Sequence, residues 1–249
     1  MSLAVVTGAS SGIGAATAEL LAAQGWRVLL VARRAERLEP MAARFGDALA
    51  VPADLTDPGA PERIREAAER AGGDLRLLVN NAGAAWRAPF AEGGYDNVRR
   101  TMDINFDAPV RLTEALLPLL RASTPSSIVN VSSVAGRVGR PTNGAYAASK
   151  FALAGWSESL SVEEEPRGVH VGLVLPGFVA TEGFPARQLL KSARTRWLVS
   201  TPDKVAEAIV AAGPGGKREV YVSRPYWLVP RLRHLLPGLT RRALGGGRV

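Results

Sequence analysis

The sequence contains no cysteine, and only two of its 249 residues are histidines, His170 and His234. The missing thiols exclude disulfide bonds, thiolate metal sites and cysteine catalysis. Two histidines so far apart in the chain do not form the clustered set of ligands that a metal centre needs, so we expect no metal. Any chemistry must therefore use hydroxyl, carboxylate, amide or amino groups.

Long apolar runs are also missing. No stretch reaches the roughly 18 residues that a membrane-spanning helix needs, and Met1 leads into the first apolar segment without a basic leader. These two features predict a cytoplasmic protein. A length of 249 residues suits one large α/β domain.

Apolar runs that are typical of buried parallel strands alternate with segments that have helical spacing. The expected strands are 3–7, 27–32, 48–52, 75–80, 127–132, 169–175 and 219–222, and the expected helices are 12–23, 34–45, 60–71, 95–120, 145–165 and 202–211. This alternation predicts an α/β fold, a single-domain doubly wound parallel sheet of seven strands with helices on both faces. We expect the domain to span residues 1–224, with a substrate lid at about 182–200 and a basic extension at 225–249.

A glycine-rich turn, TGASSGIG at residues 7–14, follows the first expected strand. Gly8, Gly12 and Gly14 have no Cβ, so the backbone can approach a pyrophosphate, and the helix that follows offers unpaired N–H groups. Ser10 and Ser11 add hydroxyl groups to the same turn. The pattern favours a dinucleotide site over a plain turn between a strand and a helix.

The end of the second expected strand indicates which nicotinamide cofactor is used. An acidic residue there binds the ribose hydroxyls of NAD, whereas the 2′-phosphate of NADP needs a cation. This chain has Ala32 followed by Arg33 and Arg34. A guanidinium matches a phosphate geometrically, so we expect NADP, with NADPH preferred over NADH. The alternative is a solvated arginine that opens the next helix.

Tyr146 and Lys150 are four residues apart and share one face of an expected helix, with Ser133 thirteen residues upstream of the tyrosine. A free tyrosine has a pKa near ~10, and a neighbouring ammonium and the positive nicotinamide ring of the cofactor would both lower that pKa. The three residues predict an acid/base site in which Tyr146 donates a proton to a carbonyl oxygen and Ser133 hydrogen-bonds the same oxygen.

Together these motifs resemble the short-chain dehydrogenase/reductase family, and the resemblance covers roughly residues 3–222. The motifs follow the family's order: the glycine turn, Asp54, the Asn80-Asn81-Ala82-Gly83 segment, Asn105, Ser133, Tyr146 with Lys150, and Pro176-Gly177 with Thr181. The resemblance implies that Asn105 is a fourth catalytic residue, whose main chain helps to hold a water that links Lys150 to solvent.

By the same resemblance, a larger set of residues contacts the cofactor. The set is Gly8, Ser10, Ser11, Gly12, Ile13, Gly14, Arg33, Arg34, Asp54, Leu55, Asn81, Ala82, Gly83, Tyr146, Lys150, Pro176, Gly177, Val179 and Thr181. Asp54 would lie at the adenine ring, although an aspartate at a loop junction also favours a turn.

The expected function is interconversion of a ketone or aldehyde and an alcohol by hydride transfer with NADP(H). Apolar residues in the expected lid favour a hydrophobic substrate, namely Phe184, Leu189, Leu190, Trp197 and Leu198. The alternative is a short helix that packs its own apolar face. Trp86, Arg137 and Arg140 lie near the expected cleft without an assigned role. A reductase of 3-oxoacyl thioesters, an enzyme of dehydration or epimerisation, and an NADP redox sensor without turnover remain as alternatives.

The last part of the chain carries most of the excess charge. Residues 217–249 contain eight Lys or Arg and one acidic residue, Glu219, a balance of 8 − 1 = +7 in a protein of net charge +8. Leucines and aromatic residues alternate with these cations, and Pro230 and Pro237 interrupt the segment. We expect residues 226–243 either to pack on the protein or a partner subunit, or to lie on an anionic membrane.

Two further expectations concern partners. The tail is too apolar for a nucleic-acid-binding arm, so no nucleic acid is expected. By resemblance, the long helices before Leu120 and after Ala145 pair with a second subunit, so we expect a homodimer or homotetramer.

Overall fold

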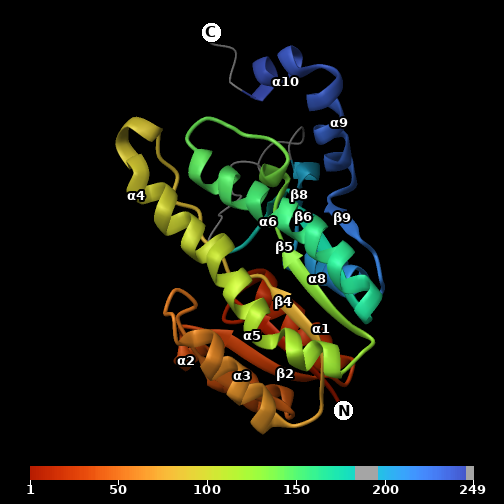
Figure 1. The fold of residues 1–249 in the computed structure, drawn as a ribbon. Coiled ribbons are helices and arrows are strands. Elements are labelled where there is room, and N and C mark those ends of the chain that lie inside the picture. The colour runs from red at the N-terminus through yellow and green to blue at the C-terminus, as the bar shows by residue number, and fades with distance from the viewer. Residues whose placement is uncertain (183–195, 245–249) are drawn as a thin grey trace.

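The computed structural model describes residues 1–182 and 196–244. Its main sheet contains seven parallel strands in the order β3-β2-β1-β4-β5-β6-β9 (Figure 1). The strands are β1 Ser2–Thr7, β2 Arg27–Ala32, β3 Ala48–Pro52, β4 Asp74–Asn80, β5 Ser126–Val131, β6 Val169–Pro176 and β9 Glu219–Val222. Two short strands, β7 Phe178–Val179 and β8 Val199–Ser200, pair separately. The expected doubly wound sheet of seven strands is confirmed.

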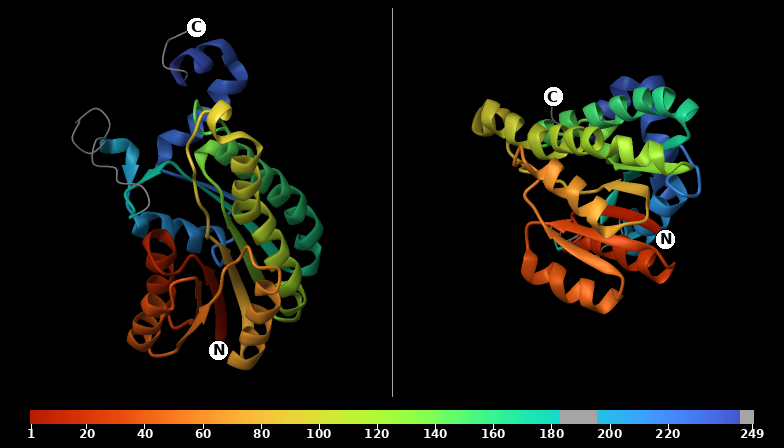
Figure 2. Two further views of the ribbon diagram at one scale, coloured as in Figure 1. Left: turned by 90° about the vertical axis from the view of Figure 1, so that its left-hand side faces the viewer. Right: turned by 60° about the horizontal axis from the view of Figure 1, so that its bottom comes forward.

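Helices cover both faces of the sheet, as the left view of Figure 2 shows. One face packs against α1 Gly12–Ala23, α2 Ala35–Phe45 and α8 Pro202–Ala212, and the other against α3 Ala60–Ala71, α5 Ala108–Ala122 and α6 Gly144–Glu164. The other α-helices among the described residues are α4 Phe90–Met102, α9 Leu228–Leu235 and α10 Pro237–Leu244.

Adjacent residues of each strand face opposite helix layers, because side chains alternate along a strand. In β2, Leu30 packs in the core beside α1 and α8, whereas Leu29 packs in the core beside α3 and α5. Helix α5 contributes Leu112, Leu116 and Leu120, all completely buried, at four-residue intervals that place them on one face. Apolar strands with buried residues on both faces therefore produce two cores, one on each side of the sheet.

The expected helix at 95–120 is wrong in one respect. Helix α4 spans Phe90–Met102 with a backbone break at Gly94 (φ 53°, ψ −158°), so the regular helix begins at Tyr95 as expected, but a π-helical turn at Asp103–Asp107 separates it from α5. Pro109 explains why a regular α-helix does not continue here, because it has no N–H to donate to the carbonyl of Asn105 four residues earlier. The π-helical turn therefore contains Asn105, which the sequence predicts to be a site residue.

The tail also differs from expectation. Pro230 does not interrupt it, because this proline lies in the first turn of α9, where a backbone N–H would have no partner within the helix. Pro237 does mark a boundary, since it begins α10.

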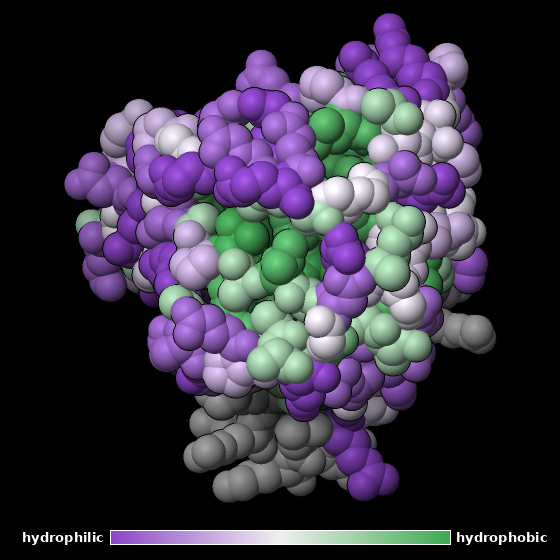
Figure 3. Space-filling view, turned by 90° about the horizontal axis from the view of Figure 1, so that it is seen from below, coloured by the Kyte–Doolittle hydropathy of each residue, from purple (hydrophilic) through white to green (hydrophobic). Residues whose placement is uncertain are grey.

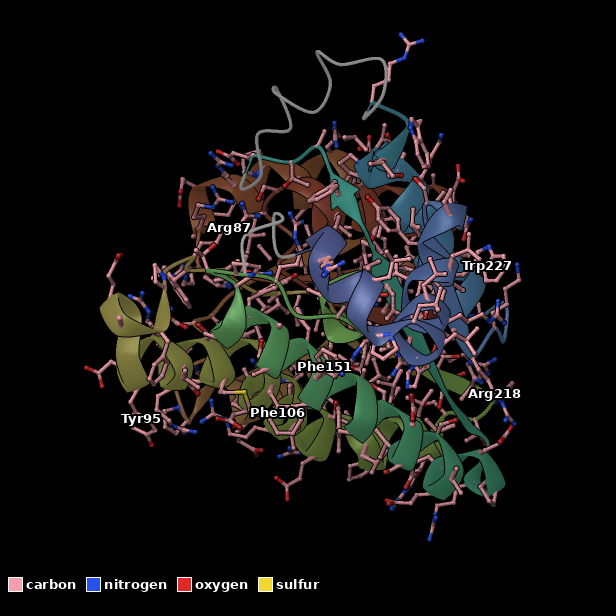
Figure 4. The ribbon with its side chains drawn as sticks, turned by 90° about the horizontal axis from the view of Figure 1, so that it is seen from above. Arg87, Tyr95, Phe106, Phe151, Arg218 and Trp227 are labelled. Atoms are coloured by element: carbon pink, nitrogen blue, oxygen red, sulfur yellow. The ribbon has the colours of Figure 1, made fainter. Side chains whose placement is uncertain are left out.

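The strand order reverses between β1 and β4, and in open α/β sheets this switch point is where ligands bind. Figure 4 views the end of the molecule at which the strands finish, and shows α9 and α10 lying across it. Figure 3 views the opposite end, where apolar residues form a central patch within a hydrophilic rim. Within residues 1–182 and 196–244, no helix is long and apolar enough to cross a bilayer.

Candidate active site

The glycine turn lies at the switch point and is bonded to the segment that follows β4. The Thr7 hydroxyl donates to the carbonyl of Val79 at 3.1 Å and accepts from the backbone N–H groups of Asn81 and Ala82 at 2.9 and 3.0 Å. The Asn81 side-chain amide donates to the Thr7 carbonyl at 2.8 Å. One threonine therefore joins the two loops that the sequence assigns to the cofactor.

Two glycines of the turn have no room for a side chain. A Cβ on Gly14 would lie 2.2 Å from the carbonyl oxygen of Gly8, and a Cβ on Gly8 would lie 2.8 Å from the Asn81 amide nitrogen. Gly8 and Gly12 also have positive φ angles of 68° and 54°. The backbone of the turn thus approaches its neighbours as closely as a dinucleotide-binding turn requires.

The arginines at the end of β2 lie beside this turn. Arg34 donates to the hydroxyl of Ser10 at 2.9 Å and to that of Ser11 at 2.9 Å. The side chain of Arg33 is 78% exposed and lies 4.0 Å from an Asp54 carboxylate oxygen. Arg34, rather than Arg33, is therefore the arginine bonded to the turn, and a contact of either with a 2′-phosphate stays a prediction.

Sequence reasoning missed a third cation and its partner. Arg37 of α2 binds the Glu182 carboxylate through two hydrogen bonds of 2.6 and 3.0 Å, and Arg34 lies 3.7 Å from the same carboxylate. The hydrogen bond from Arg37 lowers the pKa of Glu182. Because 145 residues separate this pair, no local pattern could have identified it.

Asp54 forms a local turn, which was the simpler of its two expected roles. Its carboxylate accepts from the backbone N–H of Thr56 at 3.0 Å and from the Thr56 hydroxyl at 2.8 Å, and these bonds lower the pKa of Asp54. Leu55 is buried in the core. A contact of Asp54 with adenine stays a prediction.

Asn105 is completely buried in the π turn and fixes the segment after β4. Its side chain accepts from the N–H of Ala84 and donates to the Ala84 carbonyl, each at 2.9 Å. It also donates to the hydroxyl of Ser149 at 3.0 Å, and Ser149 donates to the Tyr146 carbonyl at 2.8 Å. A Cβ on Gly83 would lie 2.7 Å from the Asn105 side-chain oxygen. Asn105 therefore connects the Gly83 loop to α6 through Ser149, a residue that sequence reasoning missed.

Lys150 is buried beneath Tyr146 on α6. Its ammonium donates to the Val131 carbonyl at 2.8 Å and lies 5.8 Å from the centre of the Tyr146 ring. The Lys150 side chain is enclosed by protein, with only 4% of the residue exposed, and this burial lowers the pKa of Lys150 to about 8. The expected proximity of lysine and tyrosine on one helix face is thus present in the structure.

Ser133 and Tyr146 come together at the end of β5. The Ser133 hydroxyl accepts from the N–H of Ala135 at 3.1 Å and donates to the Pro176 carbonyl at 3.3 Å. Burial raises the pKa of Tyr146, while a hydrogen bond with Ser133 and the positive charge of Arg87 act in the opposite direction. Burial is the largest effect of the protein's own groups, and the lowering expected with a bound nicotinamide ring stays a prediction. Sequence reasoning did not identify Arg87 as a charged neighbour of Tyr146.

The segment after β6 closes the site from the other side. The methyl group of Thr181 lies 3.2 Å from the position that a Gly12 Cβ would take, so this segment reaches the glycine turn. Val179 is buried, and a Cβ on Gly177 would lie 1.9 Å from the ring of Tyr226. The Tyr226 ring also meets Phe178 edge to face, at 6.4 Å between centroids. A residue of the tail therefore packs directly on the expected nicotinamide segment.

The three residues to which the sequence assigned no role, Trp86, Arg137 and Arg140, have different partners in the structure. Arg140 lies over the Phe178 ring, 5.6 Å from its centre. Trp86 is stacked by Arg100 of α4. Arg137 forms ion pairs with Glu158 at 2.9 Å and Glu219 at 2.6 Å, which gives it a structural role.

In the expected lid, Phe184, Leu189 and Leu190 lie outside the described residues. Trp197 is 56% exposed in the turn Arg196–Leu198.

Comparison with known proteins places this arrangement in a family. The sequence profile described as short chain dehydrogenase matches residues 2–189. The chain belongs to the short-chain dehydrogenase family. One relative is dehydrogenase/reductase SDR family member 7B of Bos taurus, 32% identical over 96% of this chain and 79% of the relative. Another is cis-4-hydroxycyclohexanecarboxylate dehydrogenase of Sinomonas cyclohexanicum, 36% identical over 83% of this chain and 87% of the relative.

Two solved structures of short-chain dehydrogenases have the same fold as this chain. A short-chain dehydrogenase of Burkholderia cenocepacia J2315 in complex with NADP has a TM-score of 0.83 and 28% identity, and covers 97% of this chain and 96% of its own. One from Streptomyces avermitilis has a TM-score of 0.82 and 31% identity, with the same two coverages. This short-chain dehydrogenase is therefore an oxidoreductase that acts on CH–OH groups of small molecules, from a family that binds NAD(P).

Proposed function

We propose that the protein is an NADP(H)-dependent oxidoreductase that interconverts a ketone or aldehyde and an alcohol. The observation that carries this proposal is the convergence of Ser133, Tyr146 and Lys150. Lys150 lies at Gly83, in the loop that the Thr7 hydroxyl bonds to the glycine turn. The crowding at Gly8 and Gly14, together with the serine and arginine groups of the turn, fits a bound dinucleotide phosphate.

Tyr146 is the proton donor and acceptor of this mechanism. When bound, NADP(H) supplies or accepts the hydride at the substrate carbon. Tyr146 holds the proton that the carbonyl oxygen gains during reduction, and the raised pKa of its hydroxyl keeps that proton in place at neutral pH. Ser133 bonds the Tyr146 hydroxyl and so fixes its direction, and its own hydroxyl can bind the same substrate oxygen.

Lys150 and Asn105 support Tyr146 in different ways. The lysine places a positive charge under the ring, which favours phenolate when the alcohol is oxidised. Asn105 positions the Gly83 loop and Ser149, and we propose that its main chain holds a water for proton exchange with Lys150. Pro109 supports this role, because it cannot satisfy the Asn105 carbonyl as an α-helix would.

The decisive variant is Tyr146→Phe. It removes one oxygen, so we expect turnover to fall at least ~100-fold while affinity for NADPH is largely retained. Turnover is measured by absorbance of the reduced cofactor with a panel of ketones, alcohols and acyl thioesters, and affinity by fluorescence titration. The matched control is Tyr95→Phe on α4, where the side chain is 69% exposed. A Tyr146→Phe enzyme with half the wild-type rate would contradict the mechanism.

The same panel distinguishes the alternatives. Selective turnover of acyl thioesters would identify the 3-oxoacyl reductase, and tight NADPH binding without any turnover would indicate a redox sensor.

Arg33 and Arg34 are proposed to select NADP over NAD through the 2′-phosphate. Arg34 supports this choice by its position on Ser10 and Ser11, and Ala32 supports it by the missing carboxylate. We expect NADPH to bind more tightly than NADH, and Arg33→Asp to remove the preference, because a charge-assisted phosphate contact contributes about 1.5–3 kcal/mol. Arg34→Asp is tested in parallel, and Arg44→Asp, a 60% exposed position in the helix α2 that follows, is the control. Equal dissociation constants of the wild type for both cofactors would refute the assignment.

The remaining expectations are proposals of the same kind. A hydrophobic substrate is supported by Phe178 and Tyr226, which meet at the segment closing the site. A homodimer or homotetramer through α5 and α6 is supported by Val162, a 75% exposed apolar residue on α6. We also propose that the catalytic domain ends near residue 224, where the basic extension begins, and that the protein acts in the cytoplasm.

A further inference from the structure

The tail exposes an unusual amount of apolar surface. Helix α9 carries Leu228, Leu232 and Leu235 at intervals of four and three residues, so the three share one helix face. They are 41%, 45% and 78% exposed, and none of the residues of α9 is buried. Beyond the bend, Leu236 is 48% and Leu239 63% exposed. Five exposed leucines within residues 228–239 are uncommon unless something covers them.

The opposite side of the tail is fixed to the protein. The Tyr226 hydroxyl donates to the Leu198 carbonyl at 3.1 Å, and its ring packs on Gly177. Arg233 donates to the Arg137 carbonyl at 2.6 Å and lies over the Phe151 ring of α6 at 5.1 Å. The leucine face therefore has a defined direction, and it lies at the end of the molecule that holds the active site (Figure 4).

Two tryptophans accompany the leucines. Trp227 is 42% exposed and is stacked by Arg231 at 4.3 Å. Trp197 is 56% exposed in the turn whose Leu198 carbonyl binds Tyr226. Tryptophan is enriched where proteins meet the boundary between lipid and water, since its ring is apolar and its N–H is polar.

The charge of the tail identifies the covering surface. No acidic residue follows Glu219, whereas Arg224, Arg231, Arg233, Arg241, Arg242 and Arg248 do. A symmetric contact between two copies would bring these cations of both tails together without acidic partners, and that contact would be repulsive. An anionic surface complements them instead. Leucines, tryptophans and arginines on one short amphipathic segment are the combination that binds an interfacial helix to anionic lipid.

We propose that α9, α10 and the Arg196–Leu198 turn dock the protein on an anionic membrane surface, with the mouth of the active site facing the lipid. The leucine face enters the interface and the arginines bind lipid phosphates. The contact needs no membrane-spanning segment. It also gives the enzyme direct access to hydrophobic carbonyl compounds or alcohols dissolved in the bilayer.

The test is co-sedimentation of the full-length protein with vesicles of phosphatidylcholine alone, or with about one third phosphatidylglycerol. We expect binding to the anionic vesicles that is at least tenfold stronger than to the neutral ones, and that decreases at about 0.5 M salt. The double variant Leu235→Glu, Leu239→Glu should bind at least tenfold more weakly, and Arg242→Gln about fivefold more weakly. The control is the double variant Leu49→Glu, Tyr95→Glu, which adds the same two charges at positions 43% and 69% exposed on β3 and α4 and should bind within twofold of wild type.

The leucine positions are exposed, so unchanged thermal unfolding of the variants establishes that they fold. Wild-type protein that stays in the supernatant with anionic vesicles at low salt overturns the proposal, as does an equal loss for the Leu49→Glu, Tyr95→Glu control. If sedimentation velocity shows a dimer that the leucine variant dissociates, and vesicles bind neither protein, a second copy covers the face instead. Because binding is measured without turnover, the result is independent of the proposed reaction.

Discussion

The active-site end of the sheet buries polar groups, whereas the tail that crosses it exposes apolar groups. At the site, polar groups are enclosed and paired, as Asn105 with Ala84 and Lys150 with the Val131 carbonyl show. In the tail, apolar groups are exposed and cations surround them, with Leu235 78% exposed. Buried polar groups are stable only with fixed partners, and exposed apolar groups are favourable only when something covers them. The difference indicates that the site is preformed, whereas the tail is completed by contact with another surface.

The largest difference between the two regions should appear on truncating leucines. Leu112 of α5 is completely buried, so Leu112→Ala should lower the free energy of unfolding by about 2–5 kcal/mol, because it leaves a cavity. Leu235→Ala in α9 should change it by less than about 0.5 kcal/mol, since the side chain already contacts water. Urea unfolding followed by circular dichroism measures both. Comparable losses for the two variants would show that the tail packs as part of the core.

The second prediction compares a buried and an exposed cation. Burial lowers the pKa of Lys150 to about 8, so between that pH and about 10.4 the folded protein binds fewer protons than the unfolded one. The contribution to stability is therefore fully present above the unfolded pKa and is lost as pH falls through about 8. Relative to Lys150→Met, the wild type should gain up to about 3 kcal/mol of unfolding free energy from pH 8 to 10.

Unfolding of the cofactor-free protein across this pH range gives the measurement. Arg242→Met, an exposed position in the tail, should follow the wild-type pH dependence. A parallel course of wild type and Lys150→Met would contradict burial of a charged lysine.

The smallest expected effect compares two glycines. Gly14→Ala forces a methyl group against the Gly8 carbonyl, so we expect a loss of about 1–3 kcal/mol in stability and weaker NADPH binding. Gly238→Ala in α10 meets no atom within 4 Å and should be neutral or stabilise by up to about 1 kcal/mol, because alanine favours helix. Thermal unfolding and cofactor titration of both variants test this. A destabilised Gly238→Ala protein would mean that other protein atoms pack against α10 at this position.

Sequence reasoning could predict those parts of the site whose geometry follows from spacing. Gly8, Gly12 and Gly14 follow a strand, and Tyr146 and Lys150 share a helix face, so local structure alone brings each group together. The fold followed from alternating apolar segments, because parallel strands buried on both faces have a simple pattern.

Contacts between distant segments could not be predicted in this way. The bonds of Arg37 to Glu182 and the effect of Arg87 on Tyr146 depend on loops that meet only in the folded chain. The effect of burial on the Tyr146 pKa could not be predicted for a related reason. The sequence shows a neighbouring lysine but does not show how the fold encloses the tyrosine hydroxyl, and burial raises the pKa.

The hydroxyl of Thr7 has a consequence for the order of folding. Its bonds reach Val79, Asn81 and Ala82, which are 72 to 75 residues away along the chain. A glycine turn that looks local in sequence is therefore held in shape by long-range contacts, whose closure is slow compared with helix formation. During synthesis the turn is made before β4, yet it cannot be fixed until β4 has been made and has paired with β1. Competence to bind the cofactor thus arises late in folding, when the two halves of the switch point meet.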